Sequence, residues 1–276
     1  MPVSIVLLGG SGMLGSEVRR FLGQDCWSPD PSELDISNPL SVAQIVDRRP
    51  ECIINCAAYT AVDLAETMQD EAFRTNALGP AYLAKAATMV DAHLIHISTD
   101  YVFDGRSSSP YIETDSTNPL GVYGRSKLEG EDAVRANCAN HTILRTAWLF
   151  GENGQNFPMT ILKAARAGKS LRVVADQWGS PTWARDFAEI VVAFRSGEYE
   201  RGLYHAAGPQ KMSWFELARL TLEVHGIKSE IEPILASDWP TPAPRPAWSV
   251  LDCPKLNKLG LAVPPIKEGL SQLRIL

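Results

Sequence analysis

The start of the chain decides the fold, where Val3-Ser4-Ile5-Val6-Leu7-Leu8 runs into Gly9-Gly10-Ser11-Gly12-Met13-Leu14-Gly15. The apolar run predicts a buried strand, and a helical stretch, Glu17–Leu22, follows the glycines. Glycines at positions 9, 12 and 15 allow a tight strand-to-helix turn and a close approach of the main chain to a pyrophosphate. The helix N-terminus adds free N–H groups and partial positive charge. This segment therefore predicts a dinucleotide site.

Short apolar runs then alternate with helical stretches, which predicts an α/β fold with a parallel sheet covered on both faces. Right-handed crossovers make this a doubly wound sheet of the Rossmann type. The expected strands are 52–56, 92–97 and 142–145, and the expected helices are 41–48, 72–90 and 127–136. After about Gly151, Pro and Trp become frequent between helical patches at 157–167, 184–194 and 214–225. We expect an NAD(P)-binding Rossmann domain at 1–150. Residues 151–276 are expected to form mainly a smaller C-terminal substrate-binding lobe, with room for segments that return to the first domain.

Composition excludes several classes of function. The chain has 276 residues, 45% of them hydrophobic, a formal net charge of -6 and no basic block, which argues against a nucleic-acid partner. Its apolar runs are too short for a membrane helix, and the N-terminus lacks the marks of a signal peptide. The five cysteines are odd in number and scattered, without a C-x-x-C pair. These features predict reduced thiols in a cytoplasmic protein, with neither a disulfide framework nor a zinc site.

Asp30, about 20 residues beyond the first glycine, stands where an acid often binds the adenosine ribose of a dinucleotide. The alternative is a turn residue in Ser28-Pro29-Asp30-Pro31. Pro31 stands where an Arg for the 2′-phosphate is expected, which favours NADH. Arg residues distant in sequence leave NADPH open, so the predicted cofactor is NADPH or NADH.

A proton-transfer set begins where the strand 92–97 ends, in Ser98-Thr99-Asp100. Further on, Tyr123-Gly124-Arg125-Ser126-Lys127 places a Tyr and a Lys four residues apart, on one face of a helix. A nearby cation favours the tyrosinate, so we expect Lys127 to assist Tyr123 and to hold the nicotinamide ribose. Tyr123 would protonate a carbonyl oxygen that Thr99 orients. The alternative is a surface Tyr and Lys with a helix-capping Ser-Thr-Asp.

The later half contributes candidate ligands for a nucleotide-linked substrate. Trp148, Trp178 and Trp183 are able to stack on a base or sugar ring, although a Trp more often belongs to the core. Arg245, between two prolines, has the geometry to bind a diphosphate bidentately, and its alternative is an exposed loop residue.

These motifs together resemble the extended short-chain dehydrogenase/reductases, and within them the dTDP-4-dehydrorhamnose reductase family. The resemblance covers nearly the whole chain. Its marks are the glycine turn, 55–63, 98–105, 123–131, Arg145-Thr146-Ala147-Trp148, 176–182 and Arg245-Pro246. The last three motifs are shared less widely among the extended members than the others, and they lie in or near the substrate lobe.

The resemblance implies reduction of the 4-keto group of dTDP-4-keto-L-rhamnose to a hydroxyl. It implies Thr99, Tyr123 and Lys127 as the catalytic set, and Thr99, Asp100 and Trp148 near the sugar nucleotide. The implied cofactor-lining residues, beside Gly9, Gly15, Tyr123 and Lys127, are Gly12, Met13, Leu14, Asp30, Asp35, Ile36, Ala58, Tyr59 and Thr60.

The resemblance leaves the quaternary state and the exact activity open. Some relatives form magnesium-linked dimers through acidic residues, and Glu17 matches one of them. The matching stretch near Arg185-Asp186 is less acidic than such a site needs, so we assign no metal ligands, expect Glu17 on a solvated helix face, and keep monomer or homodimer open. Alternatives are another nucleotide-sugar 4-reductase or epimerase, or a non-catalytic subunit like the β subunit of methionine adenosyltransferase. Asp100-Tyr101 after Thr99 disfavours a dehydratase, which usually has Asp-Glu there.

Overall fold

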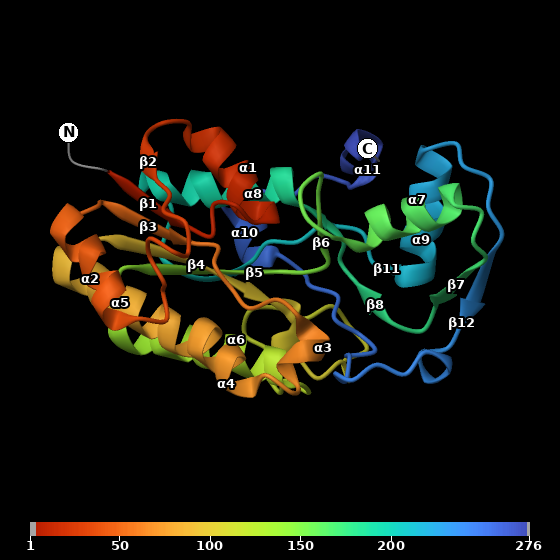
Figure 1. Cartoon of the computed structure of the whole chain (residues 1–276), viewed down its shortest axis with the longest axis horizontal. Helices are drawn as coiled ribbons and strands as arrows, with labels where there is room; N and C mark the ends of the chain where they lie inside the picture. The colour runs from red at the N-terminus through yellow and green to blue at the C-terminus, as the bar shows by residue number, and fades with distance from the viewer. Residues whose placement is uncertain (1–3, 275–276) are drawn as a thin grey trace.

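The computed structural model describes residues 4–274 and contains a six-stranded parallel sheet (Figure 1). Its strands are β1 (Ile5–Leu8), β2 (Cys26–Trp27), β3 (Cys52–Asn55), β4 (His93–Thr99), β5 (His141–Thr146) and β10 (Gly202–His205). Their spatial order is β10-β5-β4-β3-β1-β2. Val3, expected in the first strand, lies outside the described residues. The chain passes from β1 to the edge strand β2 and then returns to β3 on the other side of β1. This reversal leaves a crevice at the carboxyl ends of β1 and β3.

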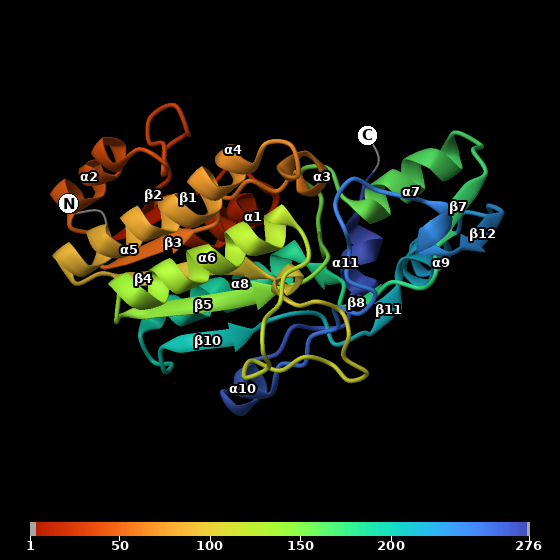
Figure 2. The ribbon, with the colours of Figure 1, turned by 90° about the horizontal axis from the view of Figure 1, so that it is seen from below.

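Helices cover both faces of the sheet, which confirms the expected doubly wound fold (Figures 1 and 2). On one face lie α1 (Met13–Leu22) and α8 (Ala184–Ala193). The other face carries α2 (Pro39–Arg48), α5 (Gly79–Val90) and α6 (Val122–Asn137). Strand side chains alternate between the two layers: Ile5 and Leu7 belong to the core under α1 and α8, whereas Val6 and Leu8 belong to the core under α2 and α5. The continuous apolar strands follow from this burial on both faces.

The single helix expected over 72–90 is interrupted in the structure. It consists of α4 (Gln69–Phe73), a π-helical turn at Arg74–Leu78, and α5. Pro80 near the start of α5 has no N–H to donate to the preceding turn, which favours a break there. Within the π turn, the Asn76 side chain accepts a hydrogen bond from the Tyr59 N–H (2.8 Å) and donates to its carbonyl (3.0 Å). The irregular turn therefore holds the loop that follows β3.

The second half of the chain divides between the sheet and a smaller lobe. Strand β10 pairs with β5, α8 packs beside α1, and α10 (Pro254–Lys258) contacts β10. The lobe, at the right of Figure 1, contains α7 (Phe157–Arg166), α9 (Trp214–Val224) and α11 (Lys267–Gln272). Three two-stranded sheets complete it, and they pair β6 (Leu149–Phe150) with β9 (Thr182–Trp183), β8 (Trp178–Gly179) with β11 (Met212–Ser213), and β7 (Leu171–Val174) with β12 (Ile231–Ile234).

The remaining short helices lie near the junction or within connections. They are α3 (Val62–Ala65) and 3₁₀ turns at Asp100–Val102, Phe194–Ser196 and Ala236–Asp238. Within residues 4–274, no helix combines the length and apolar character that a membrane span requires. All five cysteines are free thiols.

Candidate active site

The glycine turn lies at the crevice, between the end of β1 and the first turn of α1. Gly9 has a positive φ of 74°, and a Cβ there would lie 2.6 Å from the Ala57 nitrogen. A Cβ on Gly15 would overlap the Gly9 carbonyl. Side chains are therefore excluded from both positions by the backbone itself. Gly12 caps α1 in an extended conformation, and the first turn of a helix has free N–H groups that suit an anion.

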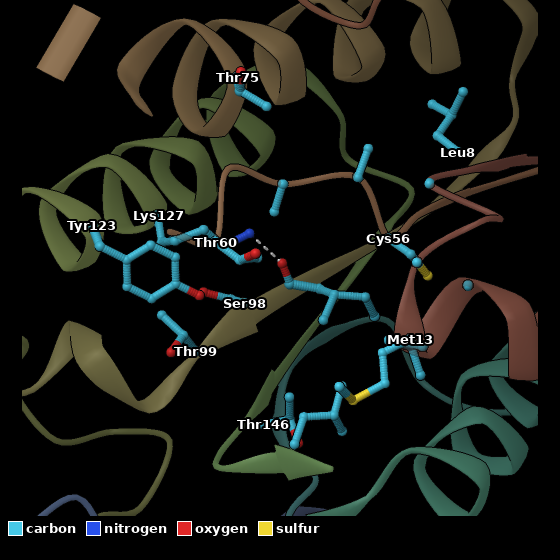
Figure 3. Close-up of a pocket in the computed structure, with 18 of the residues that line it drawn as sticks. Leu8, Met13, Cys56, Thr60, Thr75, Ser98, Thr99, Tyr123, Lys127 and Thr146 are labelled. Atoms are coloured by element: carbon cyan, nitrogen blue, oxygen red, sulfur yellow. Dashed lines mark hydrogen bonds between the residues drawn. The ribbon is translucent and has the colours of Figure 1, made fainter. Parts of the chain in front are cut away.

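A cavity of about 710 Å³ extends from this turn between the sheet and the smaller lobe. Tyr123, Lys127 and Thr99 lie together at one end of it, and Met13 lies toward the other (Figure 3). Most of the sequence-predicted site residues contribute to its wall: Gly9, Gly12, Met13, Leu14, Gly15, Asp35, Ile36, Ala58, Thr60, Thr99, Asp100, Tyr123, Lys127 and Trp148. The structure thus brings the glycine turn and the proton-transfer set into one space.

Three predicted site residues are placed elsewhere. Asp30 is exposed in the loop after β2, and Tyr59 binds Asn76 through its main chain. Neither is among the residues that line the cavity. Arg245 is bound by Asp63 of α3 through two parallel hydrogen bonds of 2.9 Å each. The bidentate grip expected for a diphosphate is therefore used within the protein, and it also lowers the pKa of the Asp63 carboxyl.

Helix α6 holds Tyr123 and Lys127 because small residues let it approach its neighbours closely. A Cβ on Gly124 would overlap the Tyr101 carbonyl, and one on Gly130 would overlap that of Asn76. The buried Lys127 ammonium donates a 2.6 Å hydrogen bond to the Ile97 carbonyl on β4 (Figure 3). Burial lowers the pKa of Lys127 to about 8, while the charge of Glu131 one turn later acts in the opposite direction.

The environment of Tyr123 favours the neutral phenol. Burial, the largest cause, raises its pKa to about 12, and the nearby Asp100 also raises it. The Thr99 hydroxyl opposes this shift as a hydrogen-bond partner of the phenol. Lys127 is not among the groups that shift the pKa of Tyr123, and its ammonium donates to a carbonyl of β4, so its support of the tyrosinate stays a prediction. Tyr123 is therefore set up to give a proton rather than to take one.

Asp100 is a buried carboxyl beside this pair, at the end of β4. Its side chain is 2% exposed, and Oδ1 accepts a 3.0 Å hydrogen bond from the Thr99 hydroxyl. Its other oxygen, Oδ2, has no hydrogen-bond partner among the described residues. Burial raises the pKa of Asp100 to about 7, although hydrogen bonds from Ser249 and Thr99 oppose the shift.

Glu131 is the second buried carboxylate near the site, one turn beyond Lys127 on α6. Arg145 donates to both of its oxygens, from Nε at 2.8 Å and from Nη2 at 2.7 Å. Ser98 donates at 2.6 Å and Arg135 at 3.2 Å. Burial alone would raise its pKa, but these partners, led by Arg145, hold the pKa of Glu131 below its usual value. The network ties α6 to β4 and β5 close to Lys127.

Sequence reasoning missed some of the residues that line the cavity, Trp214 and Thr146 among them. The Trp214 ring lies face to face with Trp148, with centroids 3.4 Å apart and planes at 4°. Trp148 itself has a left-handed backbone with φ of 46°. Trp214 begins α9 behind a Ser213–Glu216 capping box, and a helix start carries no signal for a ligand. Thr146 belonged to a quoted motif, and its buried hydroxyl has no partner in residues 4–274.

Glu17 differs from its expected place on a solvated helix face, because it is 8% exposed. The side chains of α1 and α8 pack against each other here, and its one ion pair, with Arg20, is long at 3.9 Å. In the described part of the chain, no group of three or more His, Cys, Asp or Glu side chains has the arrangement to hold a metal ion.

The parallel doubly wound sheet, the glycine turn at its switch point and the Thr-Tyr-Lys set define an extended short-chain dehydrogenase/reductase. The family model described as RmlD substrate binding domain matches residues 3–274. The chain belongs to this family.

Three relatives show how far the similarity extends. A dTDP-4-dehydrorhamnose reductase of Sinorhizobium fredii is 43% identical over 242 residues, which cover 84% of this chain and 82% of the relative. A probable dTDP-4,6-dihydroxy-2-methyloxan-3-one 4-ketoreductase of Streptomyces antibioticus is 38% identical, covering 98% of this chain and 92% of the relative. The crystal structure of a Bacillus anthracis dTDP-4-dehydrorhamnose reductase in complex with NADP superposes with a TM-score of 0.94 at 35% identity, covering 99% of both chains.

Proposed function

We propose that this protein reduces the 4-keto group of dTDP-4-keto-L-rhamnose to give dTDP-L-rhamnose, with NADPH as the reductant. One observation carries the proposal: Thr99, Tyr123 and Lys127 share a cavity with the glycine turn that suits a dinucleotide. The relatives named as dTDP-4-dehydrorhamnose reductases support the choice of substrate.

The cavity fits a nicotinamide dinucleotide. Backbone crowding excludes side chains at Gly9 and Gly15, which leaves the start of α1 open to a pyrophosphate. Asp35 and Ile36 line the wall near this turn, and Ala58 and Thr60 line it after β3. When bound, this cofactor supplies the hydride. Pro31 favoured NADH from sequence, whereas the Bacillus anthracis relative was crystallised with NADP, so we assign NADPH.

The side chains at the far end of the cavity supply the proton. Tyr123 carries its proton at neutral pH, because its pKa lies near 12. As the carbonyl carbon is reduced, negative charge grows on its oxygen, which then becomes basic enough to take the phenolic proton. Thr99 orients that oxygen, and Lys127 contributes a cation to the same wall. The buried ammonium stabilises the tyrosinate that remains after transfer.

The sugar nucleotide has a place between the reacting groups and the small lobe. Asp100 and the stacked rings of Trp148 and Trp214 line that part of the cavity. A flat aromatic surface suits a pyrimidine base or the apolar face of a deoxysugar. Reduction of another dTDP-linked 4-keto sugar is the second candidate, because the Streptomyces antibioticus relative is a probable 4-ketoreductase of a different sugar.

Cellular location and assembly stay predictions. We infer a cytoplasmic location, supported by the five free thiols. Monomer and homodimer both remain open, and a magnesium bridge is not part of the proposal.

A direct assay tests the proposed function. Purified protein is mixed with dTDP-4-keto-L-rhamnose and either NADPH or NADH, and the loss of reduced cofactor is followed by absorbance. We expect oxidation of one NADPH for each dTDP-L-rhamnose formed, with the product identified by mass spectrometry. Failure to oxidise either cofactor would rule out the reductase. Faster turnover of another dTDP-4-keto sugar would favour the second candidate.

A further inference from the structure

Asp100 has features that orientation of a sugar does not explain. A carboxylate at 2% exposure normally gains an Arg or Lys partner or several hydrogen bonds, because desolvation of its charge is costly. Asp100 instead has an oxygen, Oδ2, without any hydrogen-bond partner among residues 4–274, and it lines the cavity. Such a carboxyl is most stable when it carries a proton.

Asp100 is connected to the proton donor of the proposed reaction. The Thr99 hydroxyl is 3.0 Å from Asp100 Oδ1. Thr99 and Tyr123 lie together at one end of the cavity (Figure 3), and their interaction lowers the pKa of the phenol. A hydroxyl accepts one proton while it gives up another, so Thr99 is able to pass a proton between its two neighbours. Thr99 is therefore placed between a buried acid and the phenol.

The charged and titratable groups around Asp100 do not neutralise it. Tyr101 follows it in the same turn, and Tyr123 faces it from α6. From the segment after β12, Ser249 lowers the pKa of Asp100 while its hydroxyl donates to the Trp178 carbonyl, and the Arg245 guanidinium is held by Asp63 of α3. Lys127 belongs to the proposed catalytic set, and its ammonium donates a hydrogen bond to the Ile97 carbonyl. No cation thus contributes to the pKa of Asp100, which burial raises to about 7.

We propose that Asp100 restores the proton of Tyr123 after each turnover, through the hydroxyl of Thr99. This inference rests on the proposed function, because it assigns the source of the proton that the reductase consumes. It gives Asp100 a role distinct from contact with the sugar.

The protons balance over one cycle. Tyr123 gives its phenolic proton to the substrate oxygen as the O–H bond of the product forms, which leaves a tyrosinate. The Thr99 O–H bond then breaks as its proton moves to the tyrosinate oxygen, and the Asp100 O–H bond breaks as its proton moves to Thr99 Oγ1. Asp100 becomes a carboxylate and takes a proton from water when the product has left the cavity. The net result is one proton taken from solvent for each carbonyl reduced.

The direction of the transfer follows from the acidities of the two ends. A carboxyl with a pKa of about 7 is a stronger acid than a phenol with a pKa of about 12, so the proton moves toward the tyrosinate. At a usual carboxyl pKa of about 4, Asp100 would hold almost no proton at pH 7. Because Asp100 is buried without a neighbouring cation, its carboxyl group keeps a proton near neutral pH and is able to donate it.

The test uses the pre-steady-state kinetics of Asp100→Asn in the full-length protein. Asparagine keeps the size of the side chain and an oxygen that accepts from Thr99, but it has no acidic proton. With Tyr123 protonated at the start, the first turnover needs no relay. We expect a burst of NADPH oxidation equal to the enzyme concentration at nearly the wild-type rate, followed by steady-state turnover slower by about 10-fold to 100-fold. Asp104→Asn, an Asp in the same loop that does not line the cavity, is the matched control and keeps wild-type kinetics.

A measurement on the wild-type protein guards against a variant that misfolds. The single-turnover rate should stay nearly constant from pH 6 to about 8, whereas steady-state turnover should fall above pH about 7 as Asp100 loses its proton. Parallel pH profiles for the two rates would overturn the proposal. So would an Asp100→Asn variant with wild-type steady-state turnover, or one whose first turnover is as slow as the later ones. If the wild-type protein oxidises no NADPH with the dTDP-4-keto sugar, the proposed function itself fails and the relay with it.

Discussion

Glu131 and Asp100 are both buried beside the Tyr123–Lys127 pair, and their surroundings are opposite. Glu131 is held by Arg145 through two short hydrogen bonds and by Ser98 and Arg135. Asp100 accepts a hydrogen bond from the Thr99 hydroxyl, and no Arg or Lys among residues 4–274 contributes to its pKa. The pKa of Glu131 is lowered and that of Asp100 is raised to about 7.

The difference shows how one protein uses buried carboxyl groups for two purposes. A carboxylate with every lone pair satisfied fixes the relative position of helix and sheet. A carboxyl left without a cation retains its proton and becomes available for chemistry near neutral pH. We therefore interpret Glu131 as part of the frame beneath Lys127, and Asp100 as part of the proton path.

The largest effect is expected at the phenol, to which Asp100 connects through Thr99. Tyr123→Phe removes the proton that the substrate oxygen receives, so turnover should fall by about 100-fold to 10,000-fold. The ring stays in place, and the dissociation constant for NADPH should change little. Stopped-flow single-turnover rates and fluorescence titration of NADPH measure the two quantities. A first turnover at the wild-type rate would remove Tyr123 from the reaction.

Loss of Arg145 should destabilise the Glu131 network. Arg145→Met leaves Glu131 buried without its main partner, which should lower the free energy of unfolding by about 3–5 kcal/mol. Adding Glu131→Gln to Arg145→Met removes the uncompensated charge and should recover part of this loss. Urea unfolding at pH 7 gives both values. If the single variant is as stable as the wild type, the network is not the frame we describe.

The third prediction uses pH to separate the two carboxyl groups. The folded pKa of Asp100, about 7, lies above its unfolded value of 3.8, so its neutral form favours folding and this advantage is lost as pH rises through that interval. Asp100→Asn should thus gain stability over the wild type by up to roughly 4 kcal/mol between about pH 4 and pH 7. The pKa of Glu131 is lowered in the folded protein. Its ionised form therefore adds to the free energy of unfolding above the unfolded pKa of 4.5, and this stabilisation is lost at more acidic pH. The gap between wild type and Glu131→Gln should therefore be flat from pH 5 to about 7. Equal slopes for the two variants would contradict the assignment.

The smallest effect is expected at the edge of the Glu131 network. Arg135 is 37% exposed and contacts Glu131 Oε2 at 3.2 Å. Solvent-exposed ion pairs contribute about 0–1 kcal/mol, so Arg135→Ala should lower the free energy of unfolding by less than about 1 kcal/mol. A loss comparable with that of Arg145→Met, measured under the same urea conditions, would show that exposure does not rank these two arginines.

Sequence periodicity and glycine spacing were sufficient to predict the sheet and the glycine turn, because both depend on residues that are close together in the sequence. Buried strands that alternate with helices, together with the crowded turn at Gly9 and Gly15, are compatible with few folds other than a doubly wound sheet. The break before α5 was not predicted from the sequence. Gly79-Pro80 suits the first turn of a helix, but it does not show that another helical segment ends directly before it. Glu17 was misplaced because α1, which carries it, packs beside α8, about 170 residues away in the chain, and local sequence does not show such packing.

Contacts between residues distant in the sequence also limited the prediction of the candidate active site. Motif order placed Thr99, Tyr123 and Lys127 together, and the structure gives them one cavity. The sequence around these residues did not indicate that Asp63 would accept hydrogen bonds from the Arg245 guanidinium. It also did not indicate that Trp214 would stack on Trp148. These contacts join residues more than 60 positions apart. Likewise, burial raises the pKa of Asp100, and only the assembled fold buries this side chain.

Direct titration of the two carboxyl groups tests the central contrast most closely. Protein labelled with ¹³C at the side-chain carboxyl carbons of Asp and Glu is followed by NMR from pH 4 to 9, with Asp100→Asn and Glu131→Gln used to assign the two signals. We predict that the Asp100 signal titrates with a midpoint near pH 7, and that the midpoint of Glu131 lies below its unfolded value of 4.5. An Asp100 midpoint below pH about 5 would contradict the account, because the carboxyl would then have no proton to return to Tyr123.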